Sequence, residues 1–306
     1  MSSAIEVAGL TKRYGQRAVV DDISFELAAG RMLAFLGTDG AGKSTTISCL
    51  TGSIPFDGGV VRVAGANVAT APDTVRARIG VVFQDSLLDD TLSVHQNLHL
   101  RGRMHGLRSG DLRARITAIS EMIGLSDLLG RRYGSLSGGQ RRRADIARSL
   151  VHEPAVLFLD EPTAGLDPGS RAAVWATIRR LREARGLTVF LTTHYMEETE
   201  QADDVCIIDA GRLIARGSPE SLRAAHSRSI LTVTTLAPAR LRAIASDAGA
   251  TRAVGDDDVV EIDVADAEMA RSILLAHADS TVDFEFRHGR MDDVFLSLTS
   301  AARSGR

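Results

Sequence analysis

The sequence predicts an α/β protein followed by a smaller α+β domain, and three observations carry this prediction. An apolar run over 32–36 leads into a glycine-rich turn and then into a helical stretch. A second apolar run over 155–159 is followed by a helix and another strand, which is the βαβ order of a parallel sheet. Beyond about residue 220 the pattern changes to the order βαββαβ, which is typical of a ferredoxin-like module.

Length and composition exclude several classes of protein. A chain of 306 residues suggests two domains, and 44% apolar with 25% charged residues is typical of a folded soluble protein. The longest apolar stretches are about five residues, far short of the roughly 20 that cross a bilayer. Residues 1–6 lack the basic and apolar regions of a secretory signal. A net charge of −3 argues against a nucleic-acid partner, and we expect none.

Lysine and cysteine are both rare in this chain. Lys12 and Lys43 are its lysines, and arginine supplies the rest of the 36 basic residues. Any motif that needs a lysine must therefore use one of these two positions. Cys49 and Cys206 are far apart in the sequence, which favours two reduced thiols over a disulfide framework or a zinc site.

The first part of the chain is expected to form an antiparallel hairpin, and a helical segment follows later. Apolar and polar residues alternate around Ile5 and Val7 and again over 23–27, as in strands with one buried face. Residues 91–134 are mostly helical in pattern and open with a capping box, a serine followed three positions later by a glutamine. The apolar side chains expected to face inward in this segment are Val94, Leu98 and Met104.

The alternation of helices and strands continues from residue 171 to a domain boundary. A helix over about 171–185 has one apolar face and stops at Gly186. Strands over 187–191 and 205–208 follow, and the second turns back into 212–215. The side chains that form the apolar face of the helix are Trp175, Ile178 and Leu181.

The composition predicts two domains on either side of about residue 220. The first, 1–220, would hold the α/β core and a helical subdomain over about 84–150. The second, 221–306, would hold the βαββαβ module and a terminal helix over 291–299, whose apolar residues could equally pack into a core or dock a partner. The acidic run 256–258 between two of its strands is more typical of a solvated turn than of a metal site.

A glycine-rich stretch between the first buried strand and its helix matches the pattern GxxxxGK[ST] of a phosphate-binding loop. Glycines let backbone N–H groups turn toward phosphate oxygens, and the helix N-terminus adds partial positive charge. Lys43 is placed to reach the β and γ phosphates, and Ser44 is placed to bind Mg²⁺. The candidate nucleotide-binding residues of this loop are Gly37, Thr38, Asp39, Gly40, Ala41, Gly42, Lys43, Ser44 and Thr45.

Two adjacent carboxylates end the apolar run over 155–159. Asp160 and Glu161 lie at the carboxyl edge of the predicted sheet, where α/β proteins bind ligands. Neighbouring side chains on a strand point opposite ways, so one acid can face Mg²⁺ while the other orients and deprotonates a water molecule. We assign Asp160 to the metal and Glu161 to the water, the alternative being that both merely cap the next segment.

A second glycine-containing stretch resembles the signature of ATP-binding cassette (ABC) ATPases, which other phosphate-loop families lack. It precedes an arginine- and alanine-rich helix over 141–150, so it is another helix N-terminus suited to phosphate. The resemblance implies that two cassettes pair head to tail, each signature completing the nucleotide site of the other. The residues of the signature are Leu136, Ser137, Gly138, Gly139 and Gln140.

Four further residues follow the order of the family's motifs. Gln84 resembles the Q-loop glutamine, Asp167 the D-loop aspartate, His194 the switch histidine and Tyr14 the aromatic residue that stacks on adenine. The resemblance implies that Gln84 links Mg²⁺ and γ-phosphate to the helical segment. It also implies that His194 contacts γ-phosphate and that Asp167 contacts the partner subunit. Taken singly, such surface residues are more often simply solvated, and it is their common order that favours this interpretation.

The phosphate loop departs from the family at Thr38 and Asp39, where the usual residues are proline and asparagine. A carboxylate beside phosphates is mildly unfavourable. The backbone contacts and Lys43 are unaffected, so we expect ATP binding to survive without the contact that the asparagine normally makes.

The segments 158–168 and 192–198 are similar to those of daunorubicin-type drug exporters, and so are the three arginines 141–143 with Asp145. The cassettes of these exporters also carry a small C-terminal domain that ends in a segment like 291–296. This resemblance covers the whole chain. It implies a P-loop NTPase cassette with a mixed-sheet core, an antiparallel β subdomain and a helical subdomain, which binds ATP and Mg²⁺. Such a subunit powers export of a drug-like or lipid-like substrate through separate integral-membrane permease subunits. It would lie peripherally at the cytoplasmic face of the plasma membrane, as a homodimer or paired with another cassette.

Two other functions stay open from the sequence. A soluble cassette ATPase acting on ribosomes or DNA normally holds two cassettes in one chain or a long coiled-coil insertion, and this sequence shows neither. A nucleotide kinase is disfavoured by the cassette signature.

Overall fold

The computed structural model describes residues 3–255 and 258–304, so Asp256 and Asp257 of the expected acidic turn lie outside the described residues. The chain divides into two compact units, 1–216 and 217–306. Each unit has its own sheets and its own hydrophobic core.

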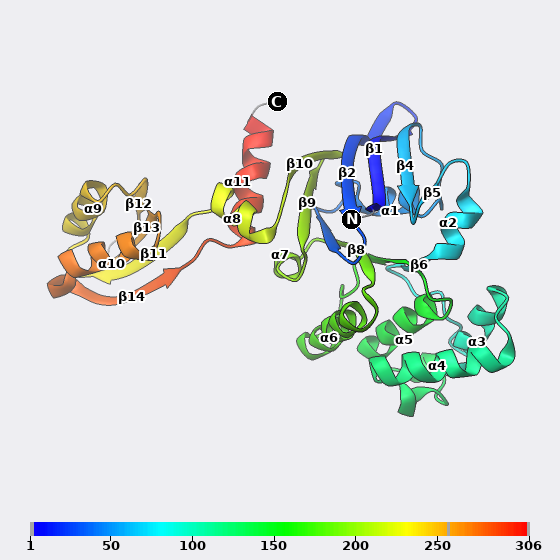
Figure 1. The fold of residues 1–306 in the computed structure, drawn as a ribbon. Coiled ribbons are helices and arrows are strands. Elements are labelled where there is room, and N and C mark those ends of the chain that lie inside the picture. The colour runs from blue at the N-terminus through cyan, green and yellow to red at the C-terminus, as the bar shows by residue number, and fades with distance from the viewer. Residues whose placement is uncertain (1–2, 256–257, 305–306) are drawn as a thin grey trace. The chain divides into compact units, whose positions relative to one another are not determined.

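The first unit begins with the predicted antiparallel sheet (Figure 1). Ile5 and Val7 are buried while Glu6 between them is exposed, which is the alternation from which the first strand was predicted. The first strand pairs antiparallel with both of its neighbours. The strands lie in the order β2-β1-β4-β5 and are β1 (Ser3–Tyr14), β2 (Arg17–Ala28), β4 (Gly58–Val63) and β5 (Ala66–Asn67), followed by helix α2 (Pro72–Arg78).

A six-stranded sheet with a parallel core forms the centre of the unit. Three of its strands, β3, β7 and β8, are buried at every position, because both faces of the sheet are covered. The parallel pairing of β9, β3, β8, β7 and β6 brings their carboxyl ends to one edge. The order is β10-β9-β3-β8-β7-β6, with β3 (Met32–Leu36), β6 (Ile79–Val82), β7 (Val156–Asp160), β8 (Thr188–Thr193), β9 (Asp204–Asp209) and β10 (Arg212–Gly217).

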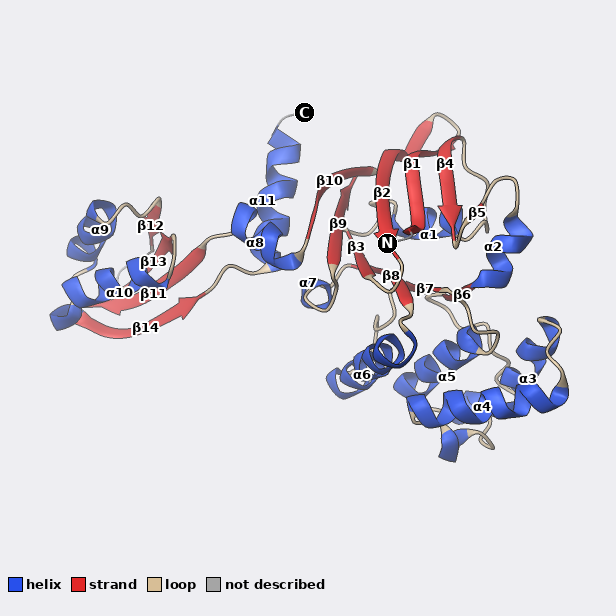
Figure 2. Ribbon diagram, in the orientation of Figure 1, coloured by secondary structure: helices blue, strands red, loops and turns tan. Residues whose placement is uncertain are grey.

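The main core lies between the two sheets, which are drawn as red arrows in Figure 2. Phe25 of the antiparallel sheet lies 5.8 Å from Phe35 and 5.9 Å from Phe190 of the central sheet, measured between ring centroids. Helix α1 (Lys43–Leu50) adds Ile47 and Leu50 to the same cluster. The helix that starts in the phosphate loop is therefore anchored by apolar packing on its buried side.

A group of helices lies on the other side of the central sheet from the antiparallel sheet (Figure 1). Helix α6 has the predicted apolar face and ends at Gly186, which adopts the left-handed conformation with φ 58°. The elements of this group and of the loops beside it are α3 (Val94–Met104), α4 (Ser109–Ile123), η1 (Ser126–Leu128), η2 (Tyr133–Ser135), α5 (Gly138–Leu150), α6 (Pro168–Arg185) and α7 (Met196–Thr199).

Helix α3 begins as predicted and ends differently. Ser93 and Gln96 form the capping box, and Val94 and Leu98 are fully buried. The expectation for Met104 is wrong, because its side chain is 71% exposed. Met104 lies ten residues after Val94, and at about 100° per residue this places its side chain about 80° around the helix axis from Val94. Met104 therefore lies on the flank of the buried face.

The second unit has the predicted βαββαβ order. Its strands lie in the order β12-β13-β11-β14, so the first and last strands of the module are neighbours, as in ferredoxin-like folds. Leu231, Val233 and Ile262 of the sheet pack with Ile273 in a single core. The elements are α8 (Pro219–His226), β11 (Ser229–Thr235), α9 (Pro238–Asp247), β12 (Arg252–Val254), β13 (Val259–Val264), α10 (Ala267–Ala276), η3 (Ala278–Ser280), β14 (Thr281–Arg287) and α11 (Met291–Ser304).

The last strand and the last helix differ in how they use their apolar residues. In β14, Phe286 packs against the core, whereas Val282 and Phe284 remain 62% and 56% exposed, because β14 is an edge strand. In α11, Val294 and Phe295 are buried, and the helix packs against α8. Of the two alternatives for this helix, core packing therefore accounts for these buried residues.

Within residues 3–255 and 258–304, no helix is both long enough and apolar enough to cross a bilayer.

Two histidines stack where the helical group meets the central sheet. The rings of His105 and His152 are nearly parallel, with centroids 3.9 Å apart. The Nε2 of His152 lies 2.9 Å from the carbonyl oxygen of Ile79, so this nitrogen carries the proton that is donated. Burial, together with the neighbouring charge of His105, lowers the pKa of His152 to about 4. The ring is therefore neutral in the folded chain at neutral pH.

We predict that His152 makes the first unit less stable in mild acid. The folded pKa lies below the unfolded value of about 6.5, so the unfolded chain binds more protons between pH 6.5 and 4. The stabilising contribution is present above pH 6.5 and is lost as the pH falls. Relative to His152→Gln, the wild type should lose on the order of 1–2 kcal/mol of unfolding free energy between pH 7.5 and pH 5.

Urea unfolding at the two pH values measures this, with the fluorescence of Trp175 as the probe. Trp175 is the single tryptophan of the chain and is buried in the first unit. A difference between wild type and variant that does not change with pH would contradict the prediction.

Candidate functional site

The phosphate loop lies where the sequence predicted, between β3 and α1, and two of its glycines have no room for a side chain. A Cβ on Gly42 would lie 2.6 Å from the carbonyl oxygen of Val19, and this residue has φ 109°. A Cβ on Gly37 would lie 2.7 Å from Ile208. The backbone can follow this path only because these positions carry no Cβ.

Lys43 is held at the centre of the loop with its side chain 4% exposed. Its Nζ donates hydrogen bonds to the carbonyl oxygens of Gly37, at 2.9 Å, and Thr38, at 3.1 Å. Two carboxylates are also close, with Glu161 Oε1 at 3.2 Å and Asp39 Oδ1 at 3.6 Å. A buried ammonium needs such partners, since its desolvation is costly.

Asp160 is the last residue of β7 and lies beside the start of α1. Its Oδ1 accepts a hydrogen bond from the Thr192 hydroxyl at 2.6 Å and from the Ser44 hydroxyl at 3.4 Å. Ser44 and Asp160 therefore present oxygen atoms to the same space. Oxygen is the ligand type that Mg²⁺ prefers, so these residues fit the ion that the sequence implied.

Glu161 points in another direction from Asp160. Its φ is 46°, an unusual value for a residue with a side chain, and its backbone N–H is held by the hydroxyl and carbonyl oxygens of Thr192. Its carboxylate contacts Lys43 and also lies 3.2 Å from Nδ1 of His194. A strained turn at the end of the strand thus aims this carboxylate at the phosphate loop.

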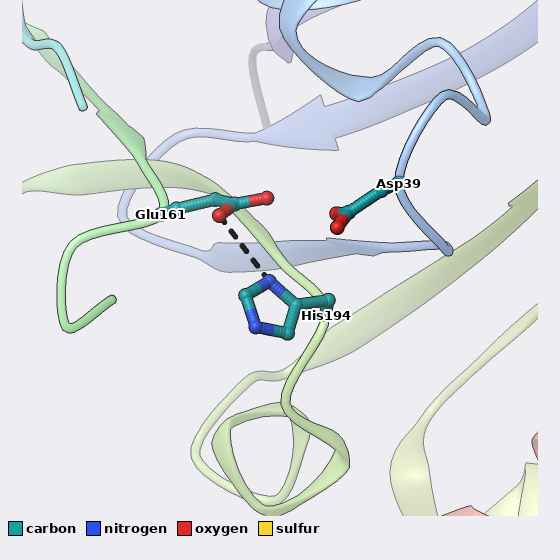
Figure 3. Close-up of side chains that lie close together, drawn as sticks. All are labelled: Asp39, Glu161 and His194. Atoms are coloured by element: carbon teal, nitrogen blue, oxygen red, sulfur yellow. Dashed lines mark ion pairs between the residues drawn. The ribbon is translucent and has the colours of Figure 1, made fainter. Parts of the chain in front are cut away.

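Figure 3 shows Asp39, Glu161 and His194 facing one another across the site. One ligand atom from each lies within 4.8 Å of the others, a spacing that could hold a metal ion. However, the Lys43 ammonium already lies within 3.6 Å of both carboxylates. This built-in cation neutralises the acids, so the trio by itself is no argument for a metal.

A pocket of about 490 Å³ is lined by nine of the predicted residues, and the predicted residues Gly37, Thr38, Ala41 and Asp160 are not part of this lining. Gln84 reaches it from the segment after β6, and Glu161 and His194 reach it from the carboxyl ends of β7 and β8. A larger pocket of about 960 Å³ lies at the start of β7 and β8 and contains none of the motif residues. The lining residues are Val19, Asp39, Gly40, Gly42, Lys43, Ser44, Thr45, Gln84, Glu161, Ala164, Gly165, His194 and Tyr195.

The lining residues that were not predicted as site residues are Val19, Ala164, Gly165 and Tyr195. Tyr195 directly follows His194, and the two rings are 4.1 Å apart between centroids. Tyr195 could have been predicted because it directly follows His194, a residue of a recognised motif. Val19 lies on β2, far from the loop in sequence, and only the fold brings it there.

Three predicted elements do not line this pocket. The signature residues Ser137 and Gln140 form a capping box at the start of α5, and Gly139 packs so tightly on Ser170 that a Cβ would lie 2.6 Å from its hydroxyl oxygen. Asp167 is the N-cap of α6 and accepts a hydrogen bond from the Ser170 N–H. Tyr14 is 55% exposed, with the Lys12 ammonium 5.3 Å from its ring centroid.

The glycine-rich loop holds the buried Lys43, and Ser44 lies beside Asp160 at the end of β7, which Glu161 directly follows. These features define a phosphate-loop nucleotide-binding protein. Residues 20–164 match the model of the ABC transporter family.

The chain is also 38% identical to a daunorubicin resistance ATP-binding protein, DrrA3 of Streptomyces coeruleorubidus, over 98% of this chain and 97% of that one. It is 38% identical to the Nod factor export ATP-binding protein I of Paraburkholderia xenovorans, over 97% of both. It is 35% identical to the linearmycin resistance ATP-binding protein LnrL of Bacillus subtilis, over 96% of this chain and 98% of that one. The chain therefore belongs to the ABC transporter family, and it is an ATPase.

Solved structures of the same kind match the fold. CbiO1 of Clostridium perfringens, part of an ABC transporter complex, gives a TM-score of 0.69 at 28% identity, over 73% of this chain and 92% of that one. The ADP conformation of MJ1267, an ABC transporter cassette, gives a TM-score of 0.66 at 25% identity, over 72% and 93%. The predicted P-loop NTPase cassette is confirmed. The alternative of a soluble ATPase acting on ribosomes or DNA is wrong, because the relatives are transporter components.

We predict that Asp39→Asn tightens ATP binding modestly. The Asp39 carboxylate is 92% exposed and lies 3.6 Å from the Lys43 ammonium, which is expected to contact the phosphates. Removing its charge should lower the Kd for ATP roughly two- to fivefold, as is typical of exposed charge pairs. Titration with a fluorescent ATP analogue at low and at high salt measures this. The difference should shrink at high salt because exposed charges are screened, and an unchanged Kd at low salt would refute the prediction.

Proposed function

We propose that this chain is the ATP-hydrolysing subunit of an exporter that acts on a drug-like or lipid-like substrate. The named relatives serve daunorubicin resistance, linearmycin resistance and Nod factor export, and the resemblance extends over nearly their full lengths. Residues 1–220 would form the nucleotide-binding domain and 221–306 an accessory domain.

Glu161 is the proposed general base, and its geometry is the observation that carries the mechanism. Its carboxylate lies between Lys43, which would contact the phosphates, and His194, which would contact γ-phosphate. When ATP enters, its phosphates would compete for the Lys43 ammonium and release Glu161 to orient a water molecule. Glu161 would then accept a proton from that water as the water oxygen bonds to the γ-phosphorus, while the bond from this phosphorus to the oxygen bridging to the β-phosphate breaks and ADP leaves.

Ser44 and Asp160 are the proposed holders of Mg²⁺, with Gln84 of the pocket lining as a third candidate. When it is bound, the ion would neutralise part of the negative charge of the phosphates. The chain's own contribution is to fix these oxygens, and Thr192 does so for Asp160 through its 2.6 Å hydrogen bond. Tyr14 is the proposed stacking surface for adenine, since its ring is exposed.

A head-to-tail dimer is the proposed working form. Ser137, Gly138, Gly139, Gln140 and Asp167 do not line the pocket of their own phosphate loop. The start of α5 offers N–H groups and the positive end of a helix, which suit the phosphates of a second cassette. This arrangement supports a site completed by another copy of the chain or by a related cassette.

Separate permease subunits are the proposed membrane partners, bound at the cytoplasmic face of the plasma membrane. The segment from Gln84 to Gly134 would make this contact, because Gln84 joins the nucleotide pocket to the helical group. Nucleotide state could then reach the permease through a local two-state element.

We predict that Glu161→Gln keeps ATP binding and abolishes turnover. The amide occupies the same volume but cannot accept a proton at neutral pH, so kcat should fall at least about a hundredfold. The Kd for ATP should not rise, because a negative charge beside the phosphates is removed. Phosphate release and ATP titration measure the two quantities.

Glu197→Gln is the matched control for this variant, since Glu197 is 87% exposed and belongs to the nearby helix α7. If Glu161→Gln still hydrolysed ATP, the assignment of Glu161 as the general base would be wrong. The same variant with ATP should elute at twice the monomer mass in size-exclusion chromatography, and a monomer there would count against the proposed dimer.

We predict that the tagged full-length chain co-purifies from native membranes with an integral-membrane protein. The relatives are ATP-binding proteins of drug resistance and of Nod factor export, so a permease subunit is the expected membrane partner. Extraction in mild detergent followed by mass spectrometry measures this. Recovery of the chain from the soluble fraction alone, with no permease attached, would contradict the exporter proposal.

A further inference from the structure

One buried arginine touches both segments that carry the proposed catalytic residues. Arg142 lies on α5 and is 7% exposed. Its guanidinium donates four hydrogen bonds, all to main-chain oxygens: Nε to Pro162 at 2.6 Å, one terminal nitrogen to Phe83 at 2.5 Å, and the other to Asp160 at 3.1 Å and Glu161 at 2.7 Å. The planar, multiply donating guanidinium suits this role, which an ammonium could fill only in part.

The carbonyl groups that Arg142 binds belong to two turns at the edge of the central sheet. Phe83 directly precedes Gln84, and residues 160–162 form the turn that contains Glu161. Glu161 is held from both sides, by Thr192 at its N–H and by Arg142 at its carbonyl oxygen. Its φ of 46° is unfavourable for a residue with a Cβ, so the surrounding hydrogen bonds must maintain it.

A second residue of the same helix holds the other side of Gln84. Asp145 is 4% exposed and accepts a hydrogen bond from the Ser86 hydroxyl at 2.6 Å. The hydroxyl of the buried Tyr133 lies 3.2 Å and 3.3 Å from the two carboxylate oxygens of Asp145. The carboxylate is thereby fixed on α5 and in turn fixes residue 86.

These two side chains lie one helical turn apart on α5 and so project from the same face. Arg142 binds residue 83 and Asp145 binds residue 86, so they bracket Gln84. The same helix begins at the signature residues Ser137 and Gly138. A single rigid element therefore links the signature, the segment of Gln84 and the turn of Glu161.

We propose that Arg142 and Asp145 are positioning residues for ATP hydrolysis: they hold the Glu161 turn and the Gln84 segment at fixed places relative to the signature helix. This rests on the proposed role of Glu161 as the general base. They act through main-chain groups and through Ser86, and they leave the phosphate loop untouched. Their loss should therefore lower the rate of the chemical step and leave ATP affinity unchanged.

Arg142→Gln in the full-length chain tests the first contact. We expect kcat to fall roughly ten- to a hundredfold, as a displaced catalytic group would cause, with the Kd for ATP within about twofold of wild type. Arg142→Lys keeps a cation that reaches some of the carbonyls and should recover part of kcat. Arg143→Gln is the matched control, because Arg143 also binds two main-chain oxygens, those of Ile123 and Gly124 at the end of α4, away from the pocket.

Ser86→Ala tests the second contact without a risk to folding, since Ser86 is exposed. We expect faster amide hydrogen exchange over residues 83–88 and a kcat about two- to fivefold lower, with ATP affinity unchanged. Tyr133→Phe removes the other hydroxyl from Asp145 and should shift exchange in the same direction.

Three outcomes would overturn the proposal: an Arg142→Gln variant with wild-type kcat, a loss of ATP binding together with kcat, or an equal loss in Arg143→Gln. If the wild type and Arg143→Gln both bind ATP without hydrolysing it, the proposed function fails instead. If Arg142→Gln does not fold, the rate and exchange data of Ser86→Ala decide the question, and wild-type values there would also overturn the proposal.

Discussion

The nucleotide site depends on one buried ammonium group. Lys43 draws oxygens from the phosphate loop and from the carboxylate at the end of β7, so a single cation ties together segments that are more than a hundred residues apart in sequence. Such a charge is stable inside the protein only while its partners stay in place. The parallel sheet meets this demand by ending its strands at one edge, and α5 packs against β6 from the helical side.

Much of the fold could be predicted because burial leaves a direct imprint on the sequence. The fully apolar runs at 32–36 and 155–159 predict covered strands, and alternation around Ile5 predicts a half-exposed one. What failed depends on neighbours. Met104 is apolar but sits on a helix flank, and Val282 and Phe284 alternate correctly but lie on an edge strand that nothing in the described unit covers completely. The local sequence pattern predicts which face of a helix or strand is apolar. It does not predict how much of that face the neighbouring elements cover.

The candidate site divides in the same way. Motif spacing indicated Lys43 and Glu161 because their chemistry demands those residue types. The resemblance included the three arginines 141–143 together with Asp145, but it could not single out Arg142 among them. Each residue of a helix is turned by about 100° from the last, so the three arginines reach the signature segment, the strand ends and the end of α4 respectively. Three neighbouring arginines thus bind different partners, and only the packed structure distinguishes them.

The scarcity of lysine has a practical consequence for anyone who wishes to modify this protein chemically. The side chain of Lys43 is 4% exposed and that of Lys12 is 10% exposed, each beside an aspartate. An amine-directed reagent applied to the folded chain is therefore expected to react mainly with the terminal amine. Reaction at Lys43 would then indicate that its side chain has become accessible in the phosphate loop. A protein that relies almost wholly on arginine for positive charge thus offers side-chain amines at two positions, Lys12 and Lys43.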